Sequence, residues 1–139
     1  MKRKVSSLVF LLTAISIALG AFGHGSQWPK HVRADVAGLA PDTIRLLALV
    51  WYWVSGTMLV FGLLLLWAWW HMRQGDRSPA FLAWLVGAFY CVEGILGAAY
   101  LGPFFLMFVV QAVALCASVW VLSRAADARS GPRVCPPSA

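Results

Sequence analysis

Four long apolar runs limit what this chain can fold into more than any other feature of its sequence. Each is close to the length of about 20 residues that a helix needs to cross a hydrocarbon core of about 30 Å. Strands are a poor alternative, because an open strand in lipid leaves its backbone groups unpaired. We therefore predict an all-α integral membrane protein, a four-transmembrane-helix bundle. Its helices are expected at residues 5–22, 45–70, 80–101 and 104–122.

The composition agrees with a chain whose main solvent partner is the lipid bilayer. Hydrophobic residues make up 61% of the sequence and charged residues only 12%, whereas a soluble domain usually has about 25% charged residues. The net charge is +6, but the basic residues lie at the ends of the apolar runs and form no patch. Nucleic acid is therefore not an expected partner.

The distribution of Lys and Arg predicts the topology. Eight of them fall on one side of the membrane, at the N-terminus, between the second and third helices and after the fourth. The other side has three, which are Lys30, Arg33 and Arg45. Because cytoplasmic loops carry the excess of positive charge, both termini are predicted to be cytoplasmic.

The remaining segments are connections and a tail around one membrane domain, predicted over residues 1–123. Residues 23–44 are expected to form an outer loop, and the turn at 102–103 is so short that the flanking helices must form an antiparallel hairpin. Residues 124–139 are small, polar and Pro-rich, which is typical of a disordered tail. "MKRK" with the following apolar stretch also fits a signal peptide cut near Gly20 or Ala21. The apolar run of about 18 residues favours a retained helix, since the apolar region of a signal peptide usually has about 7 to 15 residues.

Glu93 is the only glutamate of the chain and interrupts an apolar run. Counted from the 102–103 turn, Glu93 and Gln111 lie roughly 12 to 14 Å deep on adjacent helices. The same depth in the other helices predicts a polar layer across the bundle. Its members are Thr13, Ser16, Ser55, Thr57, Glu93 and Gln111, with Tyr90 near Glu93 on the third helix.

This layer has a functional and a structural interpretation. Acidic residues within the membrane often handle protons or bind ligands, but they also form hydrogen bonds between helices. We expect an uncharged Glu93 that donates a hydrogen bond to Gln111 or a hydroxyl group, at the edge of a helix contact. Small residues at steps of three or four predict a close helix contact beside it. They are Ala80, Ala83, Gly87, Cys91, Gly94 and Ala98.

Other residues with chemical potential fit simpler roles. His24, His31 and His71 lack the spacing of a zinc site, so they are interpreted as polar residues of the connections and no metal site is predicted. The tryptophans at both ends of the second helix are typical of anchors at the membrane surface. No phosphate-binding loop or nucleophile elbow occurs, so an enzymatic role is left open.

The way "FLLTAISIALGAFG" leads through "ADVAGLAPDT" into "RLLALVWYWVSGTMLVFG" resembles the small bacterial DoxX-like membrane proteins. The resemblance implies a four-helix protein of the bacterial inner membrane. Some members are implied to be subunits of quinone-linked oxidoreductases, so quinone is the cofactor that the resemblance suggests. No cofactor is evident from the residues themselves, and no family motif carries over to particular positions.

The function expected from these observations is that of an accessory or binding protein. It would serve a partner membrane complex or a lipophilic small molecule, with the polar layer around Glu93 as its site. Two alternatives stay open, which are the membrane subunit of a quinone-linked oxidoreductase and a small proton-coupled transporter. A homo-oligomer is an alternative to a separate protein partner.

Overall fold

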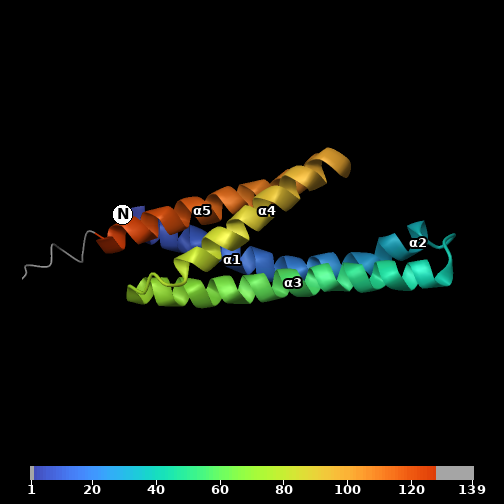
Figure 1. Cartoon of the computed structure of the whole chain (residues 1–139), viewed down its shortest axis with the longest axis horizontal. Coiled ribbons are helices and arrows are strands. Elements are labelled where there is room, and N and C mark those ends of the chain that lie inside the picture. Colours follow the sequence, from blue (N-terminus) through green and yellow to red (C-terminus); the bar gives the residue numbers. More distant parts are fainter. Residues whose placement is uncertain (1, 128–139) are drawn as a thin grey trace, which may run out of the picture. The chain divides into compact units, whose positions relative to one another are not determined.

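The computed structural model describes residues 2–127, and these residues form helices joined by short connections (Figure 1). The predicted all-α class is confirmed for this part of the chain, where no strand occurs. In chain order the elements are α1 (Lys2–Gln27), the π-helix η1 (Trp28–Val32), α2 (Arg33–Asp35), α3 (Pro41–Gln74), α4 (Ala80–Tyr100), the 3-10 helix η2 (Pro103–Phe105) and α5 (Leu106–Asp127).

Four helical stretches are long and apolar enough to cross a membrane. They are Arg3–Asp35, Pro41–Gln74, Ala80–Tyr100 and Pro103–Arg124. Only 17 to 28% of their most apolar windows is buried within the chain, and large side chains such as Trp53 (74% exposed) and Phe81 (75% exposed) lie on the surface. Soluble monomers rarely expose so much contiguous apolar area. The chain therefore has the helix lengths and the surface of a multi-pass membrane protein.

The first helical stretch is much longer than predicted. It continues through η1 and α2 to Asp35, over 33 residues, so the predicted outer loop at 23–44 is wrong for most of its length. The apolar run ends near residue 22, but a helix does not end where hydropathy falls. Pro29 is the strongest helix-breaking residue in this segment, and the chain accommodates it as a π-helix. The non-helical connection is confined to residues 36–40.

Helix α3 also extends beyond its predicted range of 45–70. It begins at Pro41, a residue favoured in the first helical turn, and has 34 residues. At 1.5 Å per residue, 33 or 34 residues span about 50 Å. This exceeds a hydrocarbon core of about 30 Å by about 20 Å. Helices of this length cross a bilayer either tilted or with their ends outside its core.

The second pair of spans agrees closely with the predicted ranges of 80–101 and 104–122. Gly102 connects them with φ +124°, a conformation that residues with a Cβ rarely adopt, and the predicted tight hairpin is confirmed. Helix α5 continues to Asp127, so residues 124–127 are helical and not the start of a disordered tail. The rest of the predicted tail, residues 128–139, lies outside the described residues.

The described chain divides into two compact units. One comprises residues 2–10 and 68–127, and the other comprises residues 11–67. The predicted polar layer is distributed over both units. Thr13, Ser16, Ser55 and Thr57 belong to the second, and Tyr90, Glu93 and Gln111 belong to the first. The layer across four helices and the single membrane domain therefore stay predictions.

Glycines allow α4 and α5 to pack closely in the first unit. A Cβ on Gly87 would lie 2.5 Å from the Cys116 sulfur, and one on Gly94 would lie 2.8 Å from the backbone nitrogen of Val109. Such distances leave no room for a methyl group. The predicted strip of small residues is thus confirmed as a helix contact at these positions, as expected where membrane helices approach closely.

The second unit contains an equally close contact between α1 and α3. A Cβ on Gly62 would lie 2.5 Å from the Cβ of Ala18 and 2.6 Å from its backbone nitrogen. Nearby, Met58 of α3 packs against Gly20 of α1, because a Cβ on Gly20 would lie 3.0 Å from the terminal methyl of Met58. The hairpin of α1 and α3 is held together at this point by backbone packed against backbone.

An indole hydrogen bond joins α1 to the end of α3 in the first unit and gives a first prediction. Trp69 Nε1–H is shared between the Ser7 carbonyl at 2.9 Å and Ser7 Oγ at 3.0 Å. Trp69→Phe should lower the free energy of unfolding in detergent by about 1 kcal/mol, the net worth of one such bond. Trp70→Phe, at a neighbouring side chain that is 56% exposed, should leave it unchanged. Equal losses in both variants would contradict a role for the hydrogen bond.

The connection between α3 and α4 gives a second prediction, which concerns pH. Asp76 accepts hydrogen bonds from Ser78 N–H at 2.9 Å and Ser78 Oγ–H at 3.1 Å, and these bonds lower the pKa of Asp76. Their contribution to the turn is therefore complete above the ordinary pKa of Asp and is lost as the pH falls through the lowered value. A carboxyl titration followed by NMR should place Asp76 below 3.8, and Ser78→Ala should raise it. Titration at or above 3.8 in the unmodified chain would contradict this.

Candidate functional site

Among the predicted site residues of the second unit, the structure brings Ser55 together with a residue from another helix. Ser55 is 9% exposed, and its hydroxyl oxygen lies 2.9 Å from His24 Nδ1. Thr13 is buried on α1, and Ser16 Oγ–H donates to the carbonyl of Thr13. Thr57 Oγ1–H donates to the carbonyl of Trp53 on its own helix. Hydroxyl groups in helices commonly make such bonds one turn back.

The predicted site residues of the first unit do not form the expected cluster. Glu93 is exposed on α4, and Gln111 is half-buried on α5. Glu93 was expected to donate a hydrogen bond to Gln111, but the side-chain oxygen of Gln111 accepts none from it. Tyr90 is buried and packs edge-on against Phe108 at 5.6 Å between ring centres. Gly94 points toward α5, and the next residue along a helix is rotated by about 100°, so Glu93 lies outside the contact.

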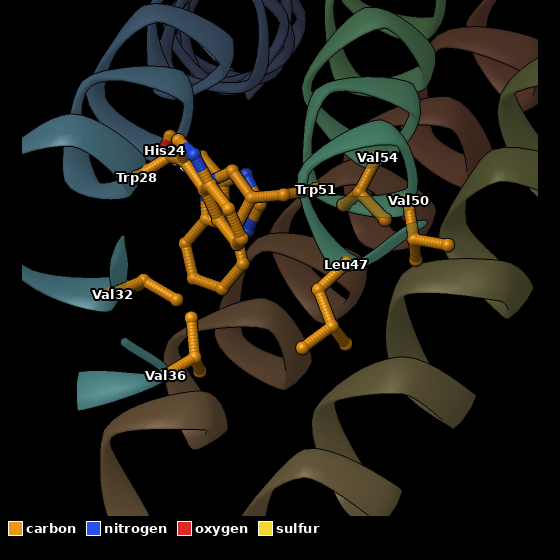
Figure 2. Close-up of a pocket in the computed structure, with 8 residues that line it drawn as sticks. All are labelled: His24, Trp28, Val32, Val36, Leu47, Val50, Trp51 and Val54. Atoms are coloured by element: carbon orange, nitrogen blue, oxygen red, sulfur yellow. Dashed lines mark hydrogen bonds between the residues drawn. The ribbon is translucent and has the colours of Figure 1, made fainter. Parts of the chain in front are cut away.

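A pocket lies instead in the second unit, where α1, η1 and the residue after α2 face α3 (Figure 2). Both walls follow the repeat of a helix, so that side chains one turn apart line the same cavity. The first wall has His24, Trp28, Val32 and Val36, and the second has Leu47, Val50, Trp51 and Val54. The cavity has a volume of about 280 Å³ and an almost entirely apolar lining.

Pro29 determines the backbone at the first wall. Proline has no N–H, so the helix around it cannot keep every backbone hydrogen bond. The chain forms the π-helix η1 here, in which Arg33 N–H bonds to the carbonyl of Trp28. The indole Nε1–H of Trp51 donates to the backbone carbonyl of His24 at 2.7 Å. A side chain of α3 thus bonds to the last turns of α1, next to the π-helix. π-Helical turns of this kind are frequent at functional sites.

The His24 ring is fixed on two sides. It stacks on Trp51 with 4.3 Å between ring centres and 14° between planes, and its Nδ1 contacts Ser55 Oγ at 2.9 Å. Trp28 lies against the same indole at 6.2 Å and is only 6% exposed. Ring contacts of this kind hold aromatic side chains in defined positions. The pocket therefore has rigid aromatic walls.

The lining indicates which molecules the pocket accepts. None of its eight lining residues carries a permanent charge, so an ionic head group would be buried without a partner, which is costly. Its volume lies near the lower end of the range for small-molecule sites and suits a ring or a short alkyl segment. Within residues 2–127 no three His, Cys, Asp or Glu side chains are grouped to hold a metal ion. The arrangement suits neutral, lipophilic ligands.

The sequence prediction included one contributor to this site, Ser55, but missed His24, Trp28 and Trp51. A signal for them exists in the sequence. His24, Trp28, Val32 and Val36 recur at steps of four, a period that indicates one face of a continuing helix. The assignment of residues 23–44 to a loop removed this face from consideration.

No protein-family model, no curated protein and no solved structure matches this chain significantly. The resemblance to DoxX-like proteins accordingly stays a prediction.

Proposed function

We propose that this chain is a membrane protein that binds a neutral, lipophilic small molecule in the pocket between α1, η1 and α3. One observation carries the proposal: a cavity of about 280 Å³ with apolar and aromatic walls and a single imidazole among its lining residues. An apolar pocket with few, well-placed polar groups is the usual form of a ligand site.

The predicted topology gives this pocket a place in the membrane. We propose, from the distribution of Lys and Arg, that both termini are cytoplasmic and that the membrane is the inner membrane of a bacterium. The pocket would then lie near the outer surface, where Trp51, Tyr52 and Trp53 form the predicted aromatic belt. An amphiphile could enter from the lipid with its head at the level of the His24 ring and its tail among the acyl chains.

The partner role that the sequence suggested has support from a different observation. Glu93 is exposed on α4 beside Val92, Ile95 and Leu96, which are 48 to 55% exposed. A charged carboxyl group facing hydrocarbon costs about 2.5 to 3.5 kcal/mol on insertion scales. We propose that a helix of another membrane protein covers this face and offers Glu93 a hydrogen bond. The quinone-linked and proton-coupled transport alternatives stay predictions.

Photolabelling tests the binding proposal. A long-chain alkyl diazirine should label residues 24–36 and 47–54 in the full chain in nanodiscs, and excess unlabelled analogue should suppress the labelling. Leu47→Trp should abolish this saturable labelling, because Leu47 lines the cavity and indole is much larger than isobutyl. Leu49→Trp is the matched control, since Leu49 is 63% exposed and lies outside the lining.

Saturability separates a site from simple partition into lipid. Labelling that is not suppressed by the analogue, or that is equal in Leu47→Trp and Leu49→Trp, would contradict the proposal.

A further inference from the structure

The hydrogen bonds around Ser55 restrict the protonation pattern of His24. The Ser55 hydroxyl has one hydrogen, and it donates to the carbonyl of Trp51 at 3.1 Å. The same oxygen lies 2.9 Å from His24 Nδ1. Either group can donate in this contact, depending on the tautomer of the imidazole. We take the arrangement in which the Ser55 hydrogen stays on the Trp51 carbonyl, so that Ser55 Oγ accepts from the imidazole and Nδ1 carries the hydrogen. A neutral imidazole has one donor and one acceptor nitrogen, which leaves Nε2 as an acceptor.

The other contacts of the His24 ring do not involve this acceptor nitrogen. One face of His24 is stacked on Trp51, the Nδ1 edge contacts Ser55, and the residue lines the cavity. The indole N–H of Trp51, the nearest donor of that stack, is already bonded to the His24 carbonyl. Within the described residues Nε2 is thus left for a ligand or for water.

From this geometry we infer that the pocket selects amphiphiles whose head group is a hydroxyl-bearing ring, a phenol-type donor. The inference rests on the proposed binding function and names its ligand class. The ring would lie among Trp28, Trp51 and the valines, and the hydroxyl would donate to His24 Nε2. An analogue without the hydroxyl hydrogen fills the same space and displaces water from Nε2, but it offers Nε2 no hydrogen bond. A buried acceptor without a hydrogen bond costs free energy, so the site should bind this analogue more weakly.

Two competitors that differ in one hydrogen-bond donor test the inference. 4-Pentylphenol and its methyl ether, 4-pentylanisole, are compared as inhibitors of the saturable diazirine labelling of the full chain in nanodiscs. The comparison is made at about pH 8, above the ordinary imidazole pKa of about 6.5, and after correction for partition into lipid. The phenol should compete at a concentration lower by about tenfold or more.

Two variants assign the discrimination to the proposed groups. His24→Phe removes the Nε2 acceptor but keeps an aromatic ring for the stack on Trp51 and keeps the backbone carbonyl. The ratio of the concentrations at which the ether and the phenol compete should therefore fall to about one. Ser55→Ala removes the group that fixes the imidazole, so the preference for phenol should shrink. Imidazole ¹⁵N shifts should show hydrogen on Nδ1 in the unmodified chain and a mixture of tautomers in Ser55→Ala.

The outcomes separate the two proposals. If labelling is saturable but the phenol and the ether compete equally, the ligand class is overturned and the binding function stays intact. The same holds if the ¹⁵N shifts show hydrogen on Nε2 of His24. An undiminished phenol preference in His24→Phe would overturn the role of His24. Absence of saturable labelling would overturn the binding function and the inference with it.

Discussion

Gly62→Ala is expected to disrupt the α1–α3 hairpin. The new methyl group would lie 2.5 to 2.6 Å from the Cβ and backbone of Ala18, and backbone cannot rotate away as a flexible side chain can. Overpacking usually costs about 1 to 3 kcal/mol, and we expect the upper end here. Equilibrium unfolding in mixed detergent, followed by circular dichroism, measures this loss.

Gly56→Ala is the matched control on the same helix. Nothing lies within 4 Å of a Cβ at Gly56, and alanine favours a helix over glycine by up to about 1 kcal/mol. The control should therefore be as stable as the original chain or more stable. If Gly62→Ala unfolded at the same detergent composition as Gly56→Ala, the close approach of α1 and α3 would be wrong.

Gly94→Ala is expected to have the second large effect, on the α4–α5 hairpin. The added methyl would lie 2.7 Å from Val109 Cγ2 and 2.8 Å from Val109 backbone nitrogen. The valine side chain can shift but its backbone nitrogen cannot, so we expect a loss of about 2 kcal/mol in the free energy of unfolding. The same unfolding experiment measures it.

Ala88→Val is the control for this second unit. Ala88 is exposed on α4, so two added methyl groups there should cost less than about 0.5 kcal/mol. A larger loss for Ala88→Val than for Gly94→Ala would contradict the assignment of the helix face that contacts α5.

The α4–α5 hairpin could be predicted from the sequence because its signals were local. A Gly-Pro turn at 102–103 gave the reversal, and the small residues around Gly87 and Gly94 gave the contact face. The surroundings of Glu93 could not be predicted in the same way. A strip of small residues gives the direction of one neighbour only, and Glu93, about 100° away from Gly94, is exposed.

The ends of α1 and α3 could not be predicted from hydropathy. Hydropathy records where side chains prefer lipid, whereas a helix ends where its backbone loses hydrogen bonds or is turned. Residues 23–35 are more polar than the preceding run and contain Pro29, so they resembled a loop. The bond from Trp51 to the His24 carbonyl depends on a segment about 25 residues away, and that information is not local.

The central claim is that the pocket beside His24 holds a neutral lipophilic molecule. Native mass spectrometry of the full chain, extracted gently from its own membranes, tests it most directly. We predict a stoichiometric small-molecule mass on the unmodified chain and on Leu49→Trp, and its absence from Leu47→Trp. A partner protein in the same spectrum that dissociates in Glu93→Leu would support the role proposed for the Glu93 face. No bound small molecule on the unmodified chain, or one retained in Leu47→Trp, would contradict the claim.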